Sequence, residues 1–330
     1  MKKIGSTVGD PAGIGVEIIL KSVHTLRRIP GCQFIIFAPA GLLGQYAHLL
    51  HSAITLPVTK STENMSKKVA VLNVADPIAF QVGKPSALTG DIAYRIVEKA
   101  IHFAAEGKID ALVTAPVCKS AINLTGRKFT GHTEMLKRMS GAKDILMFFV
   151  SKKLKTGIVT THLSIRAVPE KITRTCIVSK LQILSGELQR FFRIRKPVIG
   201  VSALNPHGGE DGFLGKEEIS IIRPAIESAQ KLGIRAEGPF PSDTIFLKSN
   251  SFDALLFMFH DQAMIPVKLL SWGCNVNVTL GLPFVRTSPD HGTGFDIAGK
   301  GIASPDSFIE AVRLACGMAK YPERKKRGRR

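Results

Sequence analysis

Aromatic side chains are scarce in this chain, which has one Trp and three Tyr among 330 residues. Such scarcity argues against a surface on which the bases of single-stranded nucleic acid would stack. No apolar run approaches the roughly 20 residues that a bilayer-spanning helix needs, and the N-terminal stretch MKKIGSTVGDPAGIG lacks the apolar core of a secretory signal peptide. The five cysteines are scattered and form no CxxC pair, which is typical of reduced thiols rather than of a disulfide framework or a zinc ribbon. Together these absences predict a soluble, cytoplasmic protein.

Acidic residues are in deficit, since 26 Asp and Glu stand against 45 Lys and Arg and the formal net charge is +19. Six of the last seven residues are Lys or Arg. Because residues 322–330 offer no apolar side chain to bury, we expect a flexible basic tail there. A basic surface can bind nucleic acid with little sequence preference, so a nucleic-acid-binding protein is one hypothesis. We favour the attraction of small anionic molecules as the use of this charge.

Short apolar segments that suit a sheet alternate with stretches of helical periodicity. One such stretch, residues 90–107, has Thr89 or Asp91 at the position of an N-cap, and another, residues 216–233, ends at a glycine suited to a helix C-terminus. Strands that alternate with helices predict mostly parallel sheets covered on both faces. A chain of this length exceeds a single core, so we expect two lobes. Strands are expected at residues 2–9, 32–39, 110–117, 156–162, 196–204 and 253–259.

Three histidines follow closely on expected strands. His162 and His260 end the segments TGIVTTH and DALLFMFH, and His207 stands three residues beyond the strand KPVIGVSAL. In open α/β sheets ligands bind at the carboxyl ends of the strands, and imidazole is a common ligand of divalent metals. The three histidines therefore predict a catalytic metal site; hydrogen bonds from each imidazole to backbone are the alternative. Their separations of 45 and 53 residues match no local metal motif.

Eight particular blocks of sequence follow one another along nearly the whole chain: GDPAGIGVE (9–17), TAPVCKSAI (114–122), GHTEML (131–136), THLSIRAVPEKIT (161–173), LNPHGGEDGFLGKEE (204–218), GPFPSDT (238–244), HDQAMIPVK (260–268) and VNVTLGLPFVRTSPDHGTGFDIAGKG (276–301). Together they resemble the 4-hydroxythreonine-4-phosphate dehydrogenase family of pyridoxal phosphate biosynthesis. The chain departs from the family at Val16, where proline is usual, and in its basic tail. The first departure affects only the start of the first helix.

The resemblance implies an α/β fold like that of isocitrate and isopropylmalate dehydrogenases, with two α/β/α lobes of mostly parallel sheets and the active site in the cleft between the lobes. We place the first lobe at residues 1–130 plus 297–321. The second lobe, at residues 131–296, would carry the metal and the dimer contacts. The family's metal ligands are drawn together at a subunit interface, so the resemblance also implies a homodimer.

The family's ligands for one divalent ion (Zn, Mg or Co) fall on His162, His207 and His260, the residues already singled out by their positions after strands. The family's substrate contacts fall on five further positions, each of which has the matching residue type: His132, Thr133, Lys268, Asn277 and Arg286.

A glycine-rich motif, GDPAGIG, matches the dinucleotide fingerprint GxGxxG only in part, and the resemblance gives it a different role. The stretch DHGTGFDIAGKG is instead similar to the segment that lies against the adenosine half of the cofactor in the isocitrate dehydrogenase group. By this analogy NAD or NADP is contacted by Gly292, Thr293, Gly294 and Asp296, with His291 at the edge of the site.

The implied reaction is NAD(P)-dependent oxidation of 4-phosphooxy-L-threonine at C3, followed by decarboxylation to 3-amino-1-hydroxyacetone 1-phosphate, in pyridoxal 5'-phosphate (vitamin B6) biosynthesis. A divalent ion would favour both steps by stabilising negative charge on the C3 oxygen. Candidates for removing the hydroxyl proton are Asp261, Asp243 and Lys268. The alternatives are that Asp243 caps a helix and that Asp261 orients His260. A rival function, oxidation of threonate or erythronate 4-phosphate, uses the same groups and is not separated by the sequence.

Overall fold

A computed structural model describes the chain except for residues 63–64, 66, 77–78, 272 and 322–330, so the basic tail lies outside the described residues. The chain divides into two units: the first is Met1–Ala142 with the described part of Leu282–Arg330, and the second is Lys143–Gly281. Residues 131–142 and 282–296, which we expected in the second lobe, therefore lie in the first unit. Packing explains the difference, because helix α5 (His132–Ser140) contacts helix α3 (Ala87–Ala105) and strand β12 (Val285–Pro289) pairs with strand β5 (Ala111–Thr114).

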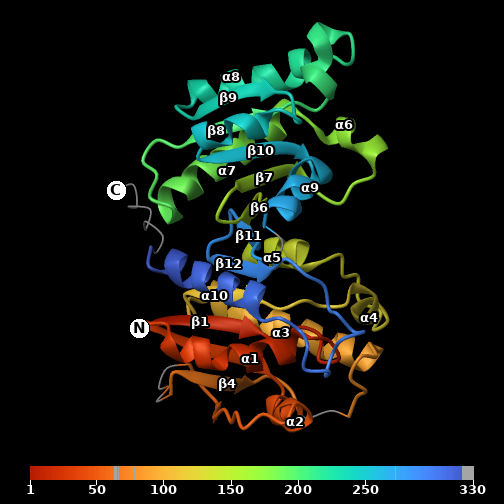
Figure 1. The fold of residues 1–330 in the computed structure, drawn as a ribbon, viewed down its shortest axis with the longest axis vertical. Coiled ribbons are helices and arrows are strands. Elements are labelled where there is room, and N and C mark those ends of the chain that lie inside the picture. The colour runs from red at the N-terminus through yellow and green to blue at the C-terminus, as the bar shows by residue number, and fades with distance from the viewer. Residues whose placement is uncertain (63–64, 66, 77–78, 272, 322–330) are drawn as a thin grey trace. The chain divides into compact units, whose positions relative to one another are not determined.

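The first unit is built on a parallel sheet (Figure 1). Apart from β3, its strands have buried centres. The inner strands are buried on both faces, which fits their near-continuous apolar sequence. Across the sheet the order is β3 (Val58–Thr59), β4 (Val69–Asn73), β2 (Cys32–Ala38), β1 (Lys2–Thr7), β5 and β12.

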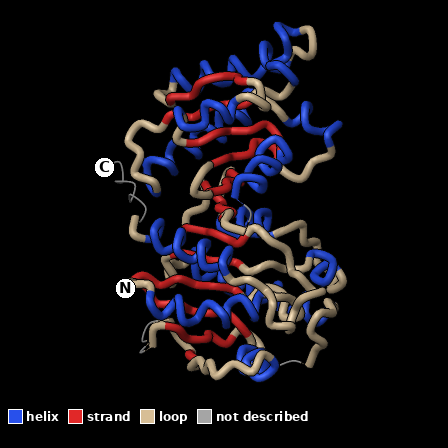
Figure 2. The backbone as a smooth tube through the Cα atoms, in the orientation of Figure 1, coloured by secondary structure: helices blue, strands red, loops and turns tan. Residues whose placement is uncertain are grey.

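Helices cover both faces of this sheet (Figure 2). Helix α10 (Asp306–Ala319) packs on β12, β5 and β1 and against α1 (Gly15–Arg28), while α3 contacts β1, β2 and β5. The other helices of the first unit are α2 (Leu42–Leu49), α4 (Lys119–Asn123) and α5.

The start of α3 differs from the prediction. Neither Thr89 nor Asp91 caps the helix; its N-cap is Ser86, whose hydroxyl accepts a hydrogen bond from Thr89 N while the Thr89 hydroxyl accepts one from Ser86 N. Asp91 instead forms ion pairs with Arg95 and Arg127. The capping box was missed because Thr replaces the Glu or Gln that usually marks its third position.

The second unit has a mostly parallel sheet with one antiparallel strand, β6, between β11 and β7. Its order is β11 (Val276–Leu280), β6 (Leu146–Val150), β7 (Lys155–Thr160), β10 (Ala254–Phe259), β8 (Val198–Ser202) and β9 (Arg235–Phe240). The pairing of the strands within each unit confirms the predicted α/β class with mostly parallel strands.

A buried cluster lies between β6, β7, β10 and helix α9 (His260–Ser271), which begins directly after β10. Phe257 and Leu255 of β10 contribute to it, together with Met264 and Val267 of α9. This packing holds the first turn of α9 at the end of the sheet. The remaining helices are α6 (Val168–Lys171), α7 (Arg174–Phe191) and α8 (Arg223–Lys231), with 3-10 segments at Ile165–Ala167, Pro206–Gly212 and Ile245–Ser251 and a π-helix at Glu218–Ile222.

No helix in the described part of the chain has the length and apolar character needed to cross a membrane.

Candidate active site

Two of the predicted metal ligands lie together at one end of the second unit's sheet. Strands β7 and β10 are parallel neighbours, and Thr160 is paired with Phe259. His162 follows two residues after Thr160, and His260 directly follows Phe259. The centroids of the two imidazole rings are 5.8 Å apart. The register of the sheet thus brings together side chains that are 98 residues apart in the sequence.

The orientation of His260 is fixed by its neighbour in the chain. Nδ1 of His260 and Oδ1 of Asp261 are 2.7 Å apart, so the Nδ1–H donates to the carboxylate and Nε2 is left to bind a ligand. A carboxylate on the second nitrogen is the usual companion of a metal-binding histidine. This contact supports the predicted role of Asp261 in orienting His260.

His207 lies in the loop that follows β8, in an unusual backbone conformation. His207, Glu210 and Asp211 all have positive φ, as do the neighbouring glycines. Nothing in the structure places His207 against the His162–His260 pair, and among the described residues no three His, Cys, Asp or Glu side chains are grouped closely enough to hold a metal ion. One chain therefore supplies an imidazole pair whose donors suit a divalent metal, and it does not complete a three-histidine site.

The base of this loop is anchored by Glu218, which is buried. Its Oε1 accepts hydrogen bonds of 2.8 Å from Leu204 N and Asn205 N, and its Oε2 accepts one of 2.9 Å from Asn205 Nδ2. Burial raises the pKa of Glu218, but the hydrogen bonds from Asn205 and Leu204 outweigh it and leave the pKa below its ordinary value. The carboxylate therefore stays ionised and holds the loop in place.

The other predicted residues of the second unit are more exposed. Asp243 is exposed and does not cap a helix, because the N-cap of the following 3-10 segment is Thr244. Lys268 is exposed in the last turn of α9. Asn277, on β11, has an Oδ1 that is shielded from solvent and accepts no hydrogen bond from the described residues.

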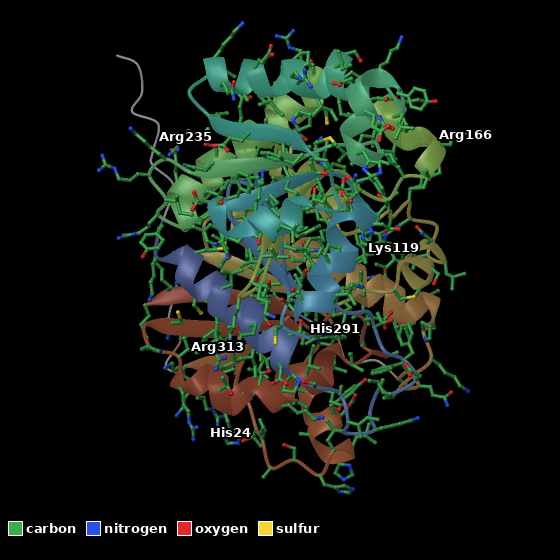
Figure 3. All side chains as sticks on the ribbon, turned by 45° about the horizontal axis from the view of Figure 1, so that its top comes forward. His24, Lys119, Arg166, Arg235, His291 and Arg313 are labelled. Atoms are coloured by element: carbon green, nitrogen blue, oxygen red, sulfur yellow. The ribbon has the colours of Figure 1, made fainter. Side chains whose placement is uncertain are left out.

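A cluster of cationic and polar groups gathers in the first unit around His132, the first residue of α5. Arg286 of β12 is buried and donates from Nη2 to Thr114 Oγ1 at 2.6 Å. A Cβ atom at Gly131, the residue before His132, would lie 3.6 Å from Nζ of Lys119 (labelled in Figure 3). Thr133 is half-buried beside them. With the N-terminus of α5, these groups form an environment that suits an anion.

Burial and the positive charges of this cluster both act on the pKa of His132. Burial lowers the pKa of the imidazole to about 3, assisted by the positive charges of Arg286 and Lys119. Burial also lowers the pKa of Arg286, to about 10, which leaves the guanidinium charged at neutral pH. His132 is thus a neutral hydrogen-bonding group between two cations.

Acidification is expected to destabilise the protein through His132. The folded state lowers its pKa from 6.5 to about 3, so between these values the unfolded chain binds more protons. The stability contributed by this group is complete above about pH 6.5 and is lost as the pH falls toward 3. Between pH 7 and pH 5 we expect the free energy of unfolding to decrease by about 2 kcal/mol from this group. Denaturant titrations at both pH values measure the decrease, and an identical decrease in a His132→Gln variant would contradict the assignment.

The glycine-rich motif near the N-terminus packs against the predicted cofactor segment. Ile14 N donates to Thr293 O at 2.9 Å, and a Cβ atom at Gly13 would lie only 2.8 Å from the same oxygen. Glu17, fully buried, accepts hydrogen bonds from Gly299 N and Ala303 N. The motif therefore supports the segment after β12. Of the predicted cofactor contacts, Gly292 and Asp296 are exposed, whereas Thr293 and Gly294 are half-buried.

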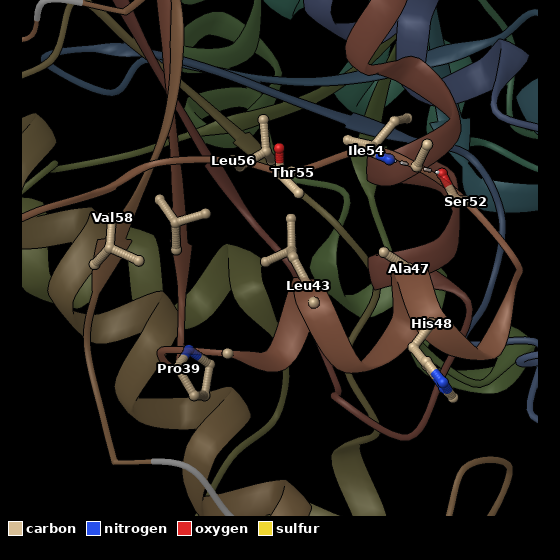
Figure 4. Close-up of a pocket in the computed structure, with 13 residues that line it drawn as sticks. Pro39, Leu43, Ala47, His48, Ser52, Ile54, Thr55, Leu56 and Val58 are labelled. Atoms are coloured by element: carbon tan, nitrogen blue, oxygen red, sulfur yellow. Dashed lines mark hydrogen bonds between the residues drawn. The ribbon is translucent and has the colours of Figure 1, made fainter.

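A cavity of about 410 Å³ lies elsewhere in the first unit, between α2 and the segment 52–58 (Figure 4). Its walls are mostly aliphatic, and His48 is the titratable side chain that lines it. None of the predicted site residues lines it. The strand ends, rather than this cavity, carry the candidate active site.

Three residues of these groups were missed in the sequence. Lys119 belongs to the motif TAPVCKSAI and Glu218 to LNPHGGEDGFLGKEE. Gln262, two residues after His260, belongs to HDQAMIPVK, and its side chain donates to Ala203 O. Their presence in these blocks was the available signal. The partners of Glu218 lie 13 and 14 residues away in the chain, and Ala203, a partner of Gln262, lies 59 residues away. Only the fold reveals such contacts.

Comparisons with known proteins show what the whole chain is similar to. The family model described as "Pyridoxal phosphate biosynthetic protein PdxA" matches residues 30–315. The chain is 40% identical to a 4-hydroxythreonine-4-phosphate dehydrogenase of Sulfurihydrogenibium sp., over 96% of this chain and 98% of the relative. It is 39% identical to a D-threonate 4-phosphate dehydrogenase of Cupriavidus necator, over 96% and 97%.

Solved structures give the same result. The crystal structure of a 4-hydroxythreonine-4-phosphate dehydrogenase from Klebsiella pneumoniae superposes with a TM-score of 0.86 at 36% identity, covering 97% of this chain and 100% of the other. A β-decarboxylating dehydrogenase from Thermococcus kodakarensis, at 16% identity and a TM-score of 0.51 over 96% of this chain and 83% of the other, shares the fold alone. The expected relation to the isocitrate and isopropylmalate dehydrogenase fold is confirmed.

Proposed function

The chain belongs to the PdxA family of dehydrogenases, and from this premise we propose that it oxidises 4-phosphooxy-L-threonine at C3 with NAD or NADP and then decarboxylates the product. Oxidation converts the C3 hydroxyl to a carbonyl and releases a proton. Loss of CO2 from the resulting β-keto acid consumes a proton and leaves 3-amino-1-hydroxyacetone 1-phosphate. This product places the enzyme in pyridoxal 5'-phosphate biosynthesis.

The observation that carries the proposal is the His162–His260 pair at the ends of neighbouring strands, with Asp261 fixing the second ring. Imidazole nitrogens suit Zn²⁺ or Co²⁺, and Mg²⁺, which prefers oxygen ligands, suits this pair less well. When bound, a divalent ion stabilises negative charge on the substrate's C3 oxygen, and the nicotinamide ring accepts the hydride. The chain's own residues hold these groups in place: His162, His207 and His260 for the ion, and Gly292, Thr293, Gly294 and Asp296 for the cofactor.

We assign the substrate's phosphate to the cluster in the first unit, with Arg286, His132 and Thr133 as its contacts and Lys119 as an additional one. Strong ion pairs to the carboxylate would stabilise the group that must leave as neutral CO2, and would therefore oppose the second step. The phosphate keeps its charge throughout, so it is the anion that Arg286 and Lys119 can hold without cost to the reaction. Lys268 and Asn277 of the second unit are left to contact the rest of the substrate.

The proton of the C3 hydroxyl has two candidate acceptors. Asp261 is already bonded to His260 Nδ1, so its role is to orient the ring. Asp243 and Lys268 are exposed and form no hydrogen bond or ion pair with other described residues. Either can reach a ligand without breaking an existing contact.

Oxidation of D-threonate 4-phosphate is the second candidate function, because relatives of both names match this chain almost equally well. The two acids differ in an amino or a hydroxyl group at C2, while the phosphate, carboxylate and C3 hydroxyl are shared. Turnover of each acid at equal concentration, with NAD and with NADP, decides between them. A higher kcat/KM for the sugar acid would overturn the proposed substrate.

The faces beside all three histidines expose apolar side chains, which supports a homodimer in which a second copy completes the metal site. Exposed apolar residues on a monomer's surface are ordinary when single and informative when they gather near a site. Leu269 on α9 is 81% exposed and Phe213 is 84% exposed. Exposed apolar residues that lie within ten positions of a histidine along the chain include Leu163, Ile165, Phe213, Leu214, Ile265 and Leu269.

Replacing Leu269 by Glu is expected to dissociate the proposed dimer and to abolish turnover. In a two-fold symmetric interface the substitution acts twice, and burial of each leucine contributes about 1.5–3 kcal/mol, so the dimer dissociation constant should rise by at least about 100-fold. Sedimentation velocity and activity on the same samples measure both effects. Leu232→Glu, at an exposed position after α8, is the control that should change neither. A fully active Leu269→Glu monomer would contradict the shared site.

A further inference from the structure

The side-chain amide of Gln262, in the first turn of α9, is hydrogen-bonded in two directions at once. Its Oε1 accepts from Met258 N at 3.1 Å and Phe259 N at 3.4 Å, the last residues of β10. Its Nε2 donates to Ala203 O at 2.9 Å and to Ser242 Oγ at 2.7 Å. One amide thus joins the ends of β10 and β8 to the segment after β9.

These bonds lie where the sheet no longer joins the strands. The paired register of β8 and β10 runs from Ile199 and Ala254 to Val201 and Leu256. Ala203 and Met258 stand two residues beyond it, at the point where the chain leaves β8 toward His207 and leaves β10 toward His260. Beyond the last backbone pairing of β8 and β10, the Gln262 amide therefore joins the two segments, one of which leads to His207 and the other to His260.

Three hydroxyl groups extend this connection. Ser242 Oγ lies 2.8 Å from Ser202 Oγ and donates to Ala203 O at 3.0 Å. Thr160, two residues before His162, donates from Oγ1 to Met258 O at 2.7 Å. The ends of β7, β10 and β8 are consequently held to one another by side chains, and Gln262 is the member that touches both β10 and β8.

The loop that carries His207 depends on such anchors. It contains residues with positive φ in place of a regular helix, and Glu218 holds its base by accepting hydrogen bonds from Leu204 N and Asn205 N. Gln262 also donates weakly to Leu204 O at 3.4 Å. The first residues of the loop are thus fixed on both their N–H and their C=O sides.

We propose that Gln262 is a positioning residue for divalent-cation binding: its amide holds in place both the end of β10, which leads to His260, and the start of the His207 loop. The inference rests on the proposed function, because it presupposes that these histidines bind a metal ion. Gln262 itself has no free donor or acceptor for the ion, since both ends of its amide are occupied by backbone and Ser242. Its effect reaches the ion through the imidazoles.

Gln262→Leu and Gln262→Glu test the proposal. Leucine removes the bonds in both directions, whereas glutamate keeps the shape and places a carboxylate oxygen against the carbonyl oxygen of Ala203. Loss of a group that supports metal ligands typically lowers metal affinity about 10- to 100-fold, and we expect a loss of this size in both variants. The matched control is Gln230→Leu, since Gln230 also bonds backbone, donating to Ala236 O at 2.8 Å at the other end of the sheet.

The measurement is the dissociation constant of Zn²⁺ and of Co²⁺ from full-length protein, by competition with a chelator. The thermal midpoint of each variant without metal shows whether it is folded. The expected result is weakened binding by both Gln262 variants, wild-type affinity in Gln230→Leu, and recovery of Gln262→Leu turnover at saturating ion. Wild-type affinity in the Gln262 variants, with normal binding by the wild type, would overturn this inference alone. Failure of the wild type itself to bind either ion would overturn the proposed metal site and the inference with it.

Discussion

Replacing His207 by Asn should lower turnover by more than about 100-fold while the protein stays folded. Replacing a residue that merely supports metal ligands lowers metal affinity or activity about 10- to 100-fold. His207 is proposed as a ligand itself, so its replacement should have a larger effect. Asn suits the test because His207 has a φ of 52°, a left-handed conformation that Asn tolerates better than most residues. His207→Ala should lose activity to the same degree and unfold more easily, by about 1 kcal/mol, because of the strained backbone.

The control for this substitution is His24→Asn, at an exposed position on α1 (Figure 3). It removes one imidazole from the first unit and should leave turnover and metal binding unchanged. Circular dichroism and the thermal midpoint establish that each variant is folded. Turnover by His207→Asn at the wild-type rate in the presence of a chelator would remove His207 from the site.

Arg286→Ala should raise KM for the phosphorylated acid by about 10- to 150-fold and leave KM for the nicotinamide cofactor nearly unchanged. A hydrogen bond to a charged group is worth about 1.5–3 kcal/mol, which gives this range at 1.4 kcal/mol per tenfold. The loss should appear in KM because the phosphate is held equally before and during the reaction. Arg286→Lys keeps the charge but loses the planar donor pair, so its effect should be smaller and still measurable.

Arg286 is buried and bonded to Thr114, so part of any effect could come from lost packing. Thr114→Val removes the hydroxyl and keeps the volume, and it should alter KM far less than Arg286→Ala. Lys119→Ala tests the same anion site at an exposed position, and it should raise KM without loss of stability. The control is Lys128→Ala, also at an exposed position, which should leave KM unchanged. Unchanged KM in both Arg286→Ala and Lys119→Ala would refute the assignment of the phosphate to this cluster.

The strand-end histidines could be predicted because two simple signals coincide on them. Apolar runs of four to eight residues predict buried strands, and parallel strands put their carboxyl ends at one edge of a sheet. The paired register of Thr160 and Phe259 fulfils this prediction for His162 and His260. The order of the strands across the sheet could not be predicted, since it depends on which apolar faces pack together over long distances in the sequence.

The strand that carries Arg286 was not predicted from the sequence. The segment VRTSP forms the buried strand β12, yet its polar residues give no apolar run, and the sequence allowed a loop there. Its burial depends on the hydrogen bond to Thr114 and on the cover that α10 provides. The left-handed residues around His207 were missed for a similar reason, because Glu210 and Asp211 rarely adopt positive φ without anchors such as Glu218.

The central claim is a metal-dependent oxidative decarboxylation. Its most direct test supplies 4-phosphooxy-L-threonine as substrate and measures the reduced nicotinamide cofactor and the CO2 formed in the same reaction. We predict equal amounts of the two products, loss of both when a chelator is added, and recovery of both with Zn²⁺ or Co²⁺. Cofactor reduction without CO2, or an undiminished rate in excess chelator, would contradict the account.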